Sequence, residues 1–501
     1  MRTLVSLLSG LVLSLALQPA ARAQVVWTGG SLVDNNWSTH ANWRNSMPPA
    51  IISIATVHFA GEIRTFPHID TRWSLAGLAF NTGASTFTLD GSELTIGSSG
   101  IANNSVNSQA INNNITLGDA QTWSAAAGDL TVGGNVDNGG SLLTAHAESG
   151  KYLMISGNVS DDGALTKTGG GTLILSGTNS YSGGTTINAG ILQAGAVNAF
   201  GTGPMTVTGD GLGYGYGNTA TLDLNGFDQT IGPLAGDAGG VVSLSYNSGL
   251  GTTGNLTTDA RGISTEFAGK IGGGGALTVV DSSGGGMLTL SGASNDYSGG
   301  TTVDGSSGSV TLKASGGFGG SSSLGTGAVV VNSGGTLAGN GFITGLTTIN
   351  SGGHLAPGDP IALTTGVLRF DGGLTLASGS ILDFKLGSVS DQIRVTGGEF
   401  NVNGPIRLNL SVVGDFNLIT GSPYTLIDFS DVDSSYININ DFTFGTLPGD
   451  TLLGDYSLSL GGSMLILNFN LAAVPEPSTY AAICGALALA LSVWRRRRTA
   501  T

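Results

Sequence analysis

The strongest constraint on the fold is a pair of phrases that the chain contains twice. The stretch GGTLILSG at residues 170–177 returns as GGMLTLSG at residues 285–292. Shortly after each copy, NSYSGGTTI at residues 179–187 matches NDYSGGTTV at residues 295–303. A short unit of this kind cannot bury its apolar face alone, so it must stack on its neighbours. The repeat therefore predicts a solenoid-like stack.

Each unit divides into short strands separated by glycine turns. In the first copy we expect strands over Thr172 to Ser176, Thr185 to Asn188 and Ile191 to Ala194. The alternation in Leu288-Thr289-Leu290-Ser291 is the period-2 pattern of a strand with one buried face. Between the two ends of the chain no stretch has convincing helical periodicity. Similar strand phrases occur at Phe87 to Gly91, Ala220 to Leu224 and Val329 to Val331.

Composition agrees with a β-solenoid. Glycine supplies 85 of 501 residues, while 10% of residues are charged and 40% are apolar. Disorder needs low hydrophobicity and high charge, so this balance argues against it, whereas glycine suits corners that need a positive φ. At roughly 20 residues per coil and 4.8 Å between coils, the chain would form about 22 coils in a rod about 100 Å long. The alternative is a set of β-sandwiches, which would show domain-length units with longer strands.

The repeat also resembles the autotransporter-associated β-strand repeat. The residues that carry this resemblance are LTKTGGGTL at 165–173 and YSGGTT at 181–186. The second copy departs from it, because Val279-Val280-Asp281 stands where the first has Lys167-Thr168. Two later stretches, 353–359 and 390–395, are similar to the later part of such passengers, so the resemblance covers residues 165–429. It implies a right-handed parallel β-helix and nothing catalytic.

The N-terminus has the three-part layout of a secretory signal peptide. Arg2 precedes an apolar run from Leu4 to about Leu17, and the small-residue triplet Ala21-Arg22-Ala23 follows. A membrane anchor is the alternative, but the run is short and a cleavage site follows it directly. We therefore expect Sec-type export with cleavage after Ala23.

The C-terminus combines a turn, an apolar run and a basic cluster. The run from Thr479 to Trp494 is expected to be a single transmembrane helix that acts as a transient inner-membrane anchor. The positive-inside rule keeps the arginines cytoplasmic and everything upstream outside the cytoplasm. A plain tail anchor is the simpler interpretation. The cluster consists of Arg495, Arg496, Arg497 and Arg498.

The turn ahead of that helix gives the tail a second resemblance. Pro475, Glu476 and Pro477, followed by the apolar run and the arginines, resemble the PEP-CTERM sorting signal of Gram-negative bacteria. The resemblance covers about the last 28 residues of the chain. It implies that an exosortase-type transpeptidase cuts near the Pro-Glu-Pro turn and releases the product to the cell surface or extracellular matrix.

Charge and motif content exclude several function classes. The formal net charge is −15, and no basic stripe is available for nucleic acid. Cys484, the only cysteine, lies in the apolar tail, so the chain has no intramolecular disulfide. No P-loop, H-E-x-x-H or G-x-S-x-G motif occurs. We expect no bound cofactor.

Three of the six tryptophans, Trp27, Trp37 and Trp43, lie close together near the mature N-terminus. One hypothesis makes them a sugar-stacking platform for extracellular polysaccharide. The other, which we favour, makes them a cap over the open first coil that hides its unpaired strand edge.

Catalytic and metal-binding signals are weak. His68 and Asp70 could place two ligands on one strand face, but a single pair of this kind indicates little. Asp161 and Asp162 precede a glycine and favour a turn. We therefore expect no metal site and no catalytic residues. The alternative is a β-helix lyase or hydrolase that acts on polysaccharide through a groove built across adjacent coils.

The sequence thus predicts an all-β, right-handed parallel β-helix with one C-terminal transmembrane helix. Its expected role is that of a non-enzymatic structural or adhesive protein at the surface or in the extracellular matrix. The segments we expect are a signal peptide (1–23), a cap with the first coils (24–160), glycine-rich repeats (161–350), a C-terminal solenoid part (351–471) and a sorting signal (474–501, with the helix at 479–494 and the arginines at 495–498).

Overall fold

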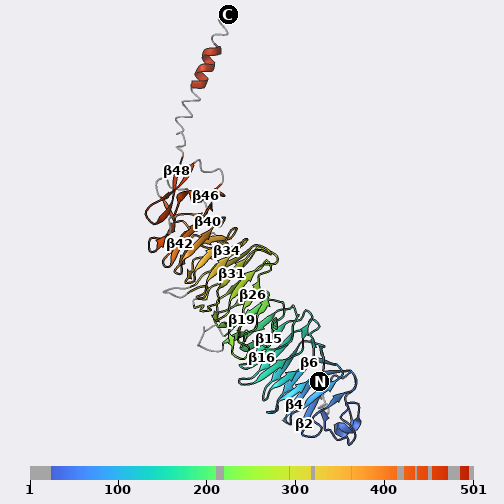
Figure 1. Ribbon diagram of the computed structural model, residues 1–501. Coiled ribbons are helices and arrows are strands. Elements are labelled where there is room, and N and C mark those ends of the chain that lie inside the picture. Colours follow the sequence, from blue (N-terminus) through green and yellow to red (C-terminus); the bar gives the residue numbers. More distant parts are fainter. Residues whose placement is uncertain are drawn as a thin grey trace, which may run out of the picture.

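The protein is an all-β solenoid whose coils stack into one long rod (Figure 1). The computed structural model describes residues 24–209, 219–292, 294–316, 322–360, 362, 364–413, 423–434, 437–448, 454–471 and 486–495. Within them the paired strands run parallel except in two local hairpins and one pairing that closes the C-terminal end. The prediction of a parallel β-solenoid with almost no helix is confirmed, and its hand is right-handed.

Each coil has three faces, which the chain visits in a fixed order. The first face begins at the N-terminal end with β1 and continues to β46. Two long early strands, β4 and β6, bend around a corner and contribute to two faces each. The strands of the first face are β1 (Val25–Trp27), β2 (Thr56–Gly61), the later halves of β4 (Trp73–Ala84) and β6 (Leu94–Asn103), β9 (Gln121–Ala125), β12 (Leu143–Ala147), β15 (Leu165–Thr168), β17 (Thr185–Ile187), β19 (Met205–Val207), β22 (Leu234–Gly236), β27 (Ser264–Phe267), β30 (Gly286–Leu290), β32 (Val310–Ala314), β34 (Gly335–Gly339), β37 (His354–Pro357), β40 (Ile381–Leu386), β43 (Ile406–Val412) and β46 (Phe442–Phe444).

The second face follows the first in every coil. Between β28 and β35 it continues through irregular segments around Asp296 and Ser323, which hydrogen-bond to Ile271 and Phe342 of the adjacent coils. Its strands are β3 (His68–Ile69), β5 (Thr88–Gly91), β7 (Gln109–Ile111), β10 (Leu130–Val132), β13 (Tyr152–Ile155), β16 (Thr172–Leu175), β18 (Gly190–Ala194), β20 (Ala220–Asp223), β23 (Gly240–Leu244), β28 (Lys270–Gly273), β35 (Phe342–Ile343), β38 (Val367–Phe370), β41 (Gln392–Val395) and β44 (Tyr424–Asp428).

The third face closes the coil. Its strands are the early halves of β4 and β6, β8 (Ile115–Leu117), β11 (Val136–Asp137), β14 (Val159–Ser160), β21 (Gln229–Ile231), β26 (Leu256–Asp259), β29 (Leu277–Val280), β31 (Thr301–Asp304), β33 (Val329–Val331), β36 (Thr347–Ile349), β39 (Leu374–Ala377), β42 (Glu399–Asn403) and β45 (Asp433–Ser434). Two hairpins add to the solenoid, β24 (Tyr246–Asn247) with β25 (Thr252–Thr253), and β47 (Gly454–Leu460) with β48 (Met464–Leu471). Strand β48 pairs with β44 and closes the C-terminal end of the second face.

Individual strands agree with the sequence expectation to within about one residue. The strands expected at Thr172 to Ser176, Thr185 to Asn188 and Ile191 to Ala194 are β16, β17 and β18. One detail is wrong. Every residue of β30 is buried, including Thr289 at 6% exposure, so this strand does not have one solvent-facing side. Thr289 lies in register between Glu266 and Lys313, whose long side chains flank it on both sides.

Coil length varies more than expected. Adjacent-coil hydrogen bonds join residues that are 18 apart at Asn332 and Asn350, 20 apart at Asn158 and Thr178, and 37 apart at Asn409 and Thr446. Most strand pairs keep their register, with shifts at β2–β4, β4–β6 and β44–β48, so coil length varies mainly between the strands. The figure of about 22 coils that a uniform 20-residue coil would give is therefore too high.

The two copies of the repeat lie on different faces. The phrase GGTLILSG forms β16 on the second face, whereas GGMLTLSG forms β30 on the first face. The downstream SGGTT phrase shifts in the same way, from β17 on the first face to β31 on the third. The repeated unit is thus a strand, an irregular segment on the next face and a strand on the face after that, and the chain uses it in two different placements.

The two ends of the chain are only partly described. Residues 1–23, where we expect the signal peptide, and residues 472–485 and 496–501 of the tail lie outside the described residues. A helix covers residues 486–495, against the expected 479–494. Among described residues, no helix is both long enough and apolar enough to cross a membrane, so the expected transmembrane helix is not shown.

Candidate functional site

The repeated phrase places one asparagine and one tyrosine inside the core. In the first copy, the Asn179 Oδ1 accepts the N–H of Val159 in the preceding coil, at 2.7 Å. Its Nδ2 donates to the carbonyl of Ala199 in the following coil. One side chain therefore satisfies backbone groups of two other coils, which a buried polar group must do to avoid an uncompensated cost.

The tyrosine of the phrase lies two residues after that asparagine and is also buried in the core. Tyr181 is fully buried, and its hydroxyl shares a hydrogen bond of 2.7 Å with Thr185 Oγ1. Burial raises the pKa of Tyr181, so the phenol stays neutral. The next coil must pass very close to its ring. A Cβ on Gly201 would lie 2.8 Å from the ring and 2.7 Å from the Tyr181 carbonyl oxygen, and φ there is +70°. Only glycine fits this corner.

The second copy repeats this arrangement one face earlier in the coil. Asn295 accepts from the Ile271 N–H at 2.8 Å and donates to the Ser323 carbonyl at 2.8 Å. Tyr297, fully buried, bonds Thr301 at 2.6 Å, and Gly325 packs against its ring. The same chemistry on two different faces indicates that the phrase is conserved within this chain for packing between coils.

One departure between the copies is a buried lysine. Lys167 is 0% exposed, and its Nζ donates to the carbonyls of Thr168, Gly169 and Ala189 at 2.8, 2.7 and 3.2 Å. Burial lowers the pKa of Lys167 to about 8, because the ammonium loses its water shell. The aligned residue of the second copy is an apolar valine.

The three N-terminal tryptophans form a buried cluster. Trp27, Trp37 and Trp43 are 0, 0 and 2% exposed. Trp43 meets the other two rings edge-on, at centroid distances of 5.2 Å (Trp27) and 5.4 Å (Trp37), and donates its indole N–H to the Trp37 carbonyl at 2.7 Å. With no ring face open to a sugar, this arrangement favours the cap interpretation over the stacking platform.

The weak metal and catalytic candidates do not come together. His68 pairs with Asp90 at 2.7 Å, while Asp70 bonds Ser38. Asp161 has φ +82° and lies in the expected turn with Asp162. Among the residues that the structure describes, no three His, Cys, Asp or Glu side chains are arranged to hold a metal ion.

The sorting-signal residues lie almost entirely outside the described residues. Of these residues the structure describes only Arg495, at the end of the helix. The residues outside the described part are Pro475, Glu476, Pro477, Arg496, Arg497 and Arg498. Their role remains an expectation drawn from the sequence.

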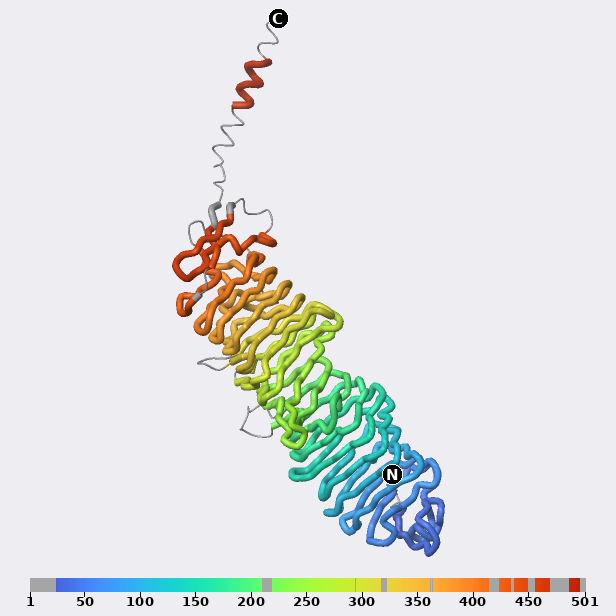
Figure 2. The backbone as a smooth tube through the Cα atoms, viewed as in Figure 1, coloured from blue at the N-terminus to red at the C-terminus, as the bar shows by residue number. Residues whose placement is uncertain are grey.

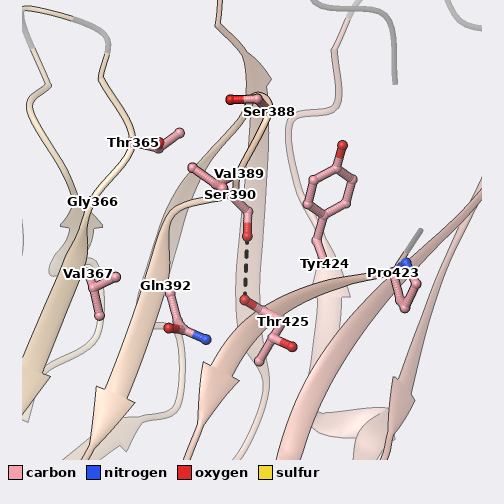
Figure 3. A pocket seen from close by; sticks show the side chains of 10 residues that line it. All are labelled: Thr365, Gly366, Val367, Ser388, Val389, Ser390, Gln392, Pro423, Tyr424 and Thr425. Atoms are coloured by element: carbon pink, nitrogen blue, oxygen red, sulfur yellow. Dashed lines mark hydrogen bonds between the residues drawn. The ribbon is translucent and has the colours of Figure 1, made fainter. Parts of the chain in front are cut away.

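A pocket of about 590 Å³ lies near the C-terminal end of the second face (Figure 3). Three successive coils form it, each at the point where its second-face strand begins, namely the starts of β38, β41 and β44. Figure 3 shows the lining side chains and the contact from the Ser390 hydroxyl to the Thr425 carbonyl, which measures 3.4 Å. The pocket is lined by Thr365, Gly366, Val367, Ser388, Val389, Ser390, Gln392, Pro423, Tyr424 and Thr425.

A buried ion pair lies next to this pocket and bonds to its lining segments. Asp391 is 0% exposed, and its carboxylate accepts the N–H of Gly366 at 2.8 Å and both the N–H and Nζ of Lys385, at 2.8 and 3.0 Å. Lys385 also donates to the Pro357 carbonyl at 2.9 Å. Burial raises the pKa of Asp391, and the Lys385 contacts oppose that rise. These bonds join two walls of the pocket to each other.

Sequence reasoning missed the pocket. Its walls come from three segments about one coil apart, and which residues meet depends on the lengths of the corner excursions between them. The stretch at residues 390–395 was recognised only as passenger-like.

Two comparisons with known proteins support the repeat. A family model described as the passenger-associated-transport-repeat matches residues 165–194 and 283–305, which contain both buried tyrosines. The chain is also 36% identical over 167 residues to the adhesin BmaC autotransporter of Brucella suis biovar 1 (strain 1330). That alignment covers 33% of this chain and 4% of the adhesin. The chain is therefore a passenger-like β-solenoid that shares a limited region with a far longer protein.

Proposed function

We propose that this protein is an exported, non-enzymatic solenoid that acts as a structural or adhesive element at the cell surface or in the extracellular matrix. The observation that carries the proposal is the stack of parallel coils in which the asparagine of each of the two passenger-type repeat copies is buried and bonds to the neighbouring coils. Figure 2 shows the coils stacked into an elongated rod, and the outer sides of its three strand faces are available to the surroundings. The similarity to an autotransporter adhesin agrees with a surface role.

The proposal includes a route to the surface. Residues 1–23 would direct Sec-type export and be removed after Ala23. The tail would then hold the protein transiently in the inner membrane until an exosortase-type transpeptidase cuts near Pro475-Glu476-Pro477. The basis for this step is the order of turn, apolar run and arginines at the end of the sequence. Extracellular polysaccharide is the partner we propose, because the chain carries a net charge of −15 and no basic stripe for a polyanion.

Deletion and complementation in the native bacterium test the adhesive role. Cells that lack the protein should attach to surfaces or retain matrix less well, and the full chain should restore both. Antibodies against the solenoid should label intact wild-type cells. Unchanged attachment and matrix in the deletion strain, or failure of such antibodies to reach the solenoid on intact cells, would contradict the proposal.

A control variant tests whether attachment needs the folded solenoid or only the presence of the chain at the cell surface. The substitutions Asn179→Ala and Asn295→Ala together remove the four hydrogen bonds that these two side chains make to neighbouring coils. We expect a frayed, protease-sensitive rod that reaches the surface but supports less attachment. Full attachment by this variant, with the middle coils demonstrably opened, would show that the solenoid body is not the adhesive element.

A further inference from the structure

We propose that the pocket at the starts of β38, β41 and β44 is a binding site for an uncharged saccharide. The inference rests on the proposed surface function and assigns that function a ligand class and a place on the rod. The site occupies about 590 Å³, within the usual size range of small-ligand pockets and sufficient for a few sugar rings of a longer chain.

The side chains that line the pocket are chemically complementary to a sugar. Hydroxyls, a phenol and a carboxamide alternate with apolar groups, so hydrogen bonds and contacts with C–H faces are available together. The Gln392 amide has no hydrogen-bond partner among the described residues, so both its donor and its acceptor are open to a ligand. Tyr424 lines the pocket from the following coil, and its hydroxyl makes one long hydrogen bond of 3.4 Å to the Gly387 carbonyl.

The charge distribution favours an uncharged ligand over an anionic one. None of the ten lining residues is charged. Beneath them the Lys385 ammonium is already matched to the buried Asp391 carboxylate. The nearest outward cation along β41 is Arg394, which pairs with Asp431 at 2.9 Å and Asp428 at 3.8 Å. The exposed Arg369, two residues beyond Val367 on β38, lies outside the lining. A phosphate, sulfate or uronate inside the pocket would therefore meet no charged lining residue and would face an acidic rod.

The walls are held in place before a ligand arrives. The turn before β41 is closed by the Gly387 N–H to the Val389 carbonyl, at 3.1 Å, and Asp391 ties that turn to Gly366 of the preceding coil. The Gln392 N–H donates to the Gly366 carbonyl at 2.9 Å. Backbone bonds of this kind set the spacing between walls, which reduces the ordering cost of binding.

Titration of the full chain with neutral and acidic oligosaccharides tests the site. The probes are cellohexaose and laminarihexaose, with hexagalacturonate as the anionic comparison. Binding is measured by saturation-transfer NMR and calorimetry. We expect at least one neutral hexaose to bind with a Kd of about 1 mM or tighter, and hexagalacturonate to bind at least about tenfold more weakly. Gln392→Ala and Tyr424→Ala should each weaken binding about tenfold or more.

The control is Thr348→Ala, which removes an outward hydroxyl on β36 of the third face, outside the pocket. It should leave affinity unchanged, and all three variants should keep the wild-type circular dichroism spectrum. The proposal is overturned if neither neutral hexaose shows binding at a concentration of about 10 mM. It is also overturned if hexagalacturonate binds as tightly as the neutral hexaoses, or if the two pocket variants bind with wild-type affinity. If the wild-type protein binds neither neutral hexaose but still supports attachment, the saccharide-site proposal is wrong and the proposed adhesive function is unaffected.

Discussion

A few buried residues determine how neighbouring coils of the solenoid pack against one another. Asn179 and Asn295 satisfy backbone groups of two neighbouring coils each, and the buried tyrosines leave room only for glycine on the following coil. These residues explain why the phrase recurs so closely. A change at any one of them would leave an unpaired buried group or an overlap.

Two glycines with nearly the same backbone conformation separate strain from overlap. Gly201 has φ +70° and a Cβ there would meet the Tyr181 ring, while Gly251 has φ +69° and open space around it. We expect Gly251→Ala to cost about 1 kcal/mol and Gly201→Ala at least about 3 kcal/mol, measured from chemical denaturation midpoints. Equal costs would show that the Tyr181 contact contributes nothing to the restriction.

Lys167 predicts a dependence of stability on pH. Its pKa falls from the ordinary value of 10.5 to about 8 in the folded protein. Between these values the unfolded chain binds a proton that the folded chain does not, so stability should rise as pH increases from about 8 to 10.5, by up to about 3 kcal/mol. Below about pH 8 both states are protonated and the contribution is constant.

The variant Lys167→Met isolates this effect. It keeps the length and apolar stem of the side chain but cannot titrate, so the difference between its denaturation midpoint and that of the wild type should change across this pH window. Parallel midpoint curves for the two proteins would show that Lys167 is not the group responsible.

At the scale of elements, the rod depends on how its ends and corners are closed. The tryptophan cluster buries the start of the first face, and β48 closes the second face at the other end by antiparallel pairing with β44. Capping matters in a solenoid because each coil contacts only its neighbours, and an open strand edge invites association.

Removal of one cap residue should therefore have a local effect. Trp43→Ala deletes both edge-on ring contacts and the bond to the Trp37 carbonyl, at a cost of about 3–5 kcal/mol. Hydrogen exchange should accelerate in β1, β2 and β4 and stay unchanged in β38 and β41. Trp123→Ala, at a buried site inside the stack, is the comparison and should loosen β9 and its neighbours instead. Uniform acceleration along the whole rod after Trp43→Ala would contradict a local cap.

Strands were predictable from sequence because their signals are local. Apolar and hydroxyl residues between glycines placed β16, β17 and β18 correctly. The face on which a strand lies was not predictable, because corner excursions decide it and they have no periodic signal. The burial of Thr289 depends on flanking strands, and the pocket depends on three coils meeting, so neither could be found from one stretch.

At the scale of the whole molecule, a passenger-like rod is followed by a tail that we propose is a sorting signal. The rod supplies the surface, and the neutral pocket near its C-terminal end lies close in sequence to the tail that we propose is processed. Pro475→Ala with Pro477→Ala should leave the protein uncut in the membrane, whereas neutral residues at Arg495 to Arg498 should make sorting fail. A plain tail anchor predicts no change in size or location for the proline variant.

Mass spectrometry of the mature C-terminus, recovered from surface and matrix fractions, tests the central claim most directly. If the protein is an exported solenoid released by processing at Pro475-Glu476-Pro477, the extracellular species lacks Ala481 to Thr501. The proline variant should retain those residues and remain with the membrane. An extracellular species that still carries Arg495 to Thr501 would contradict the account.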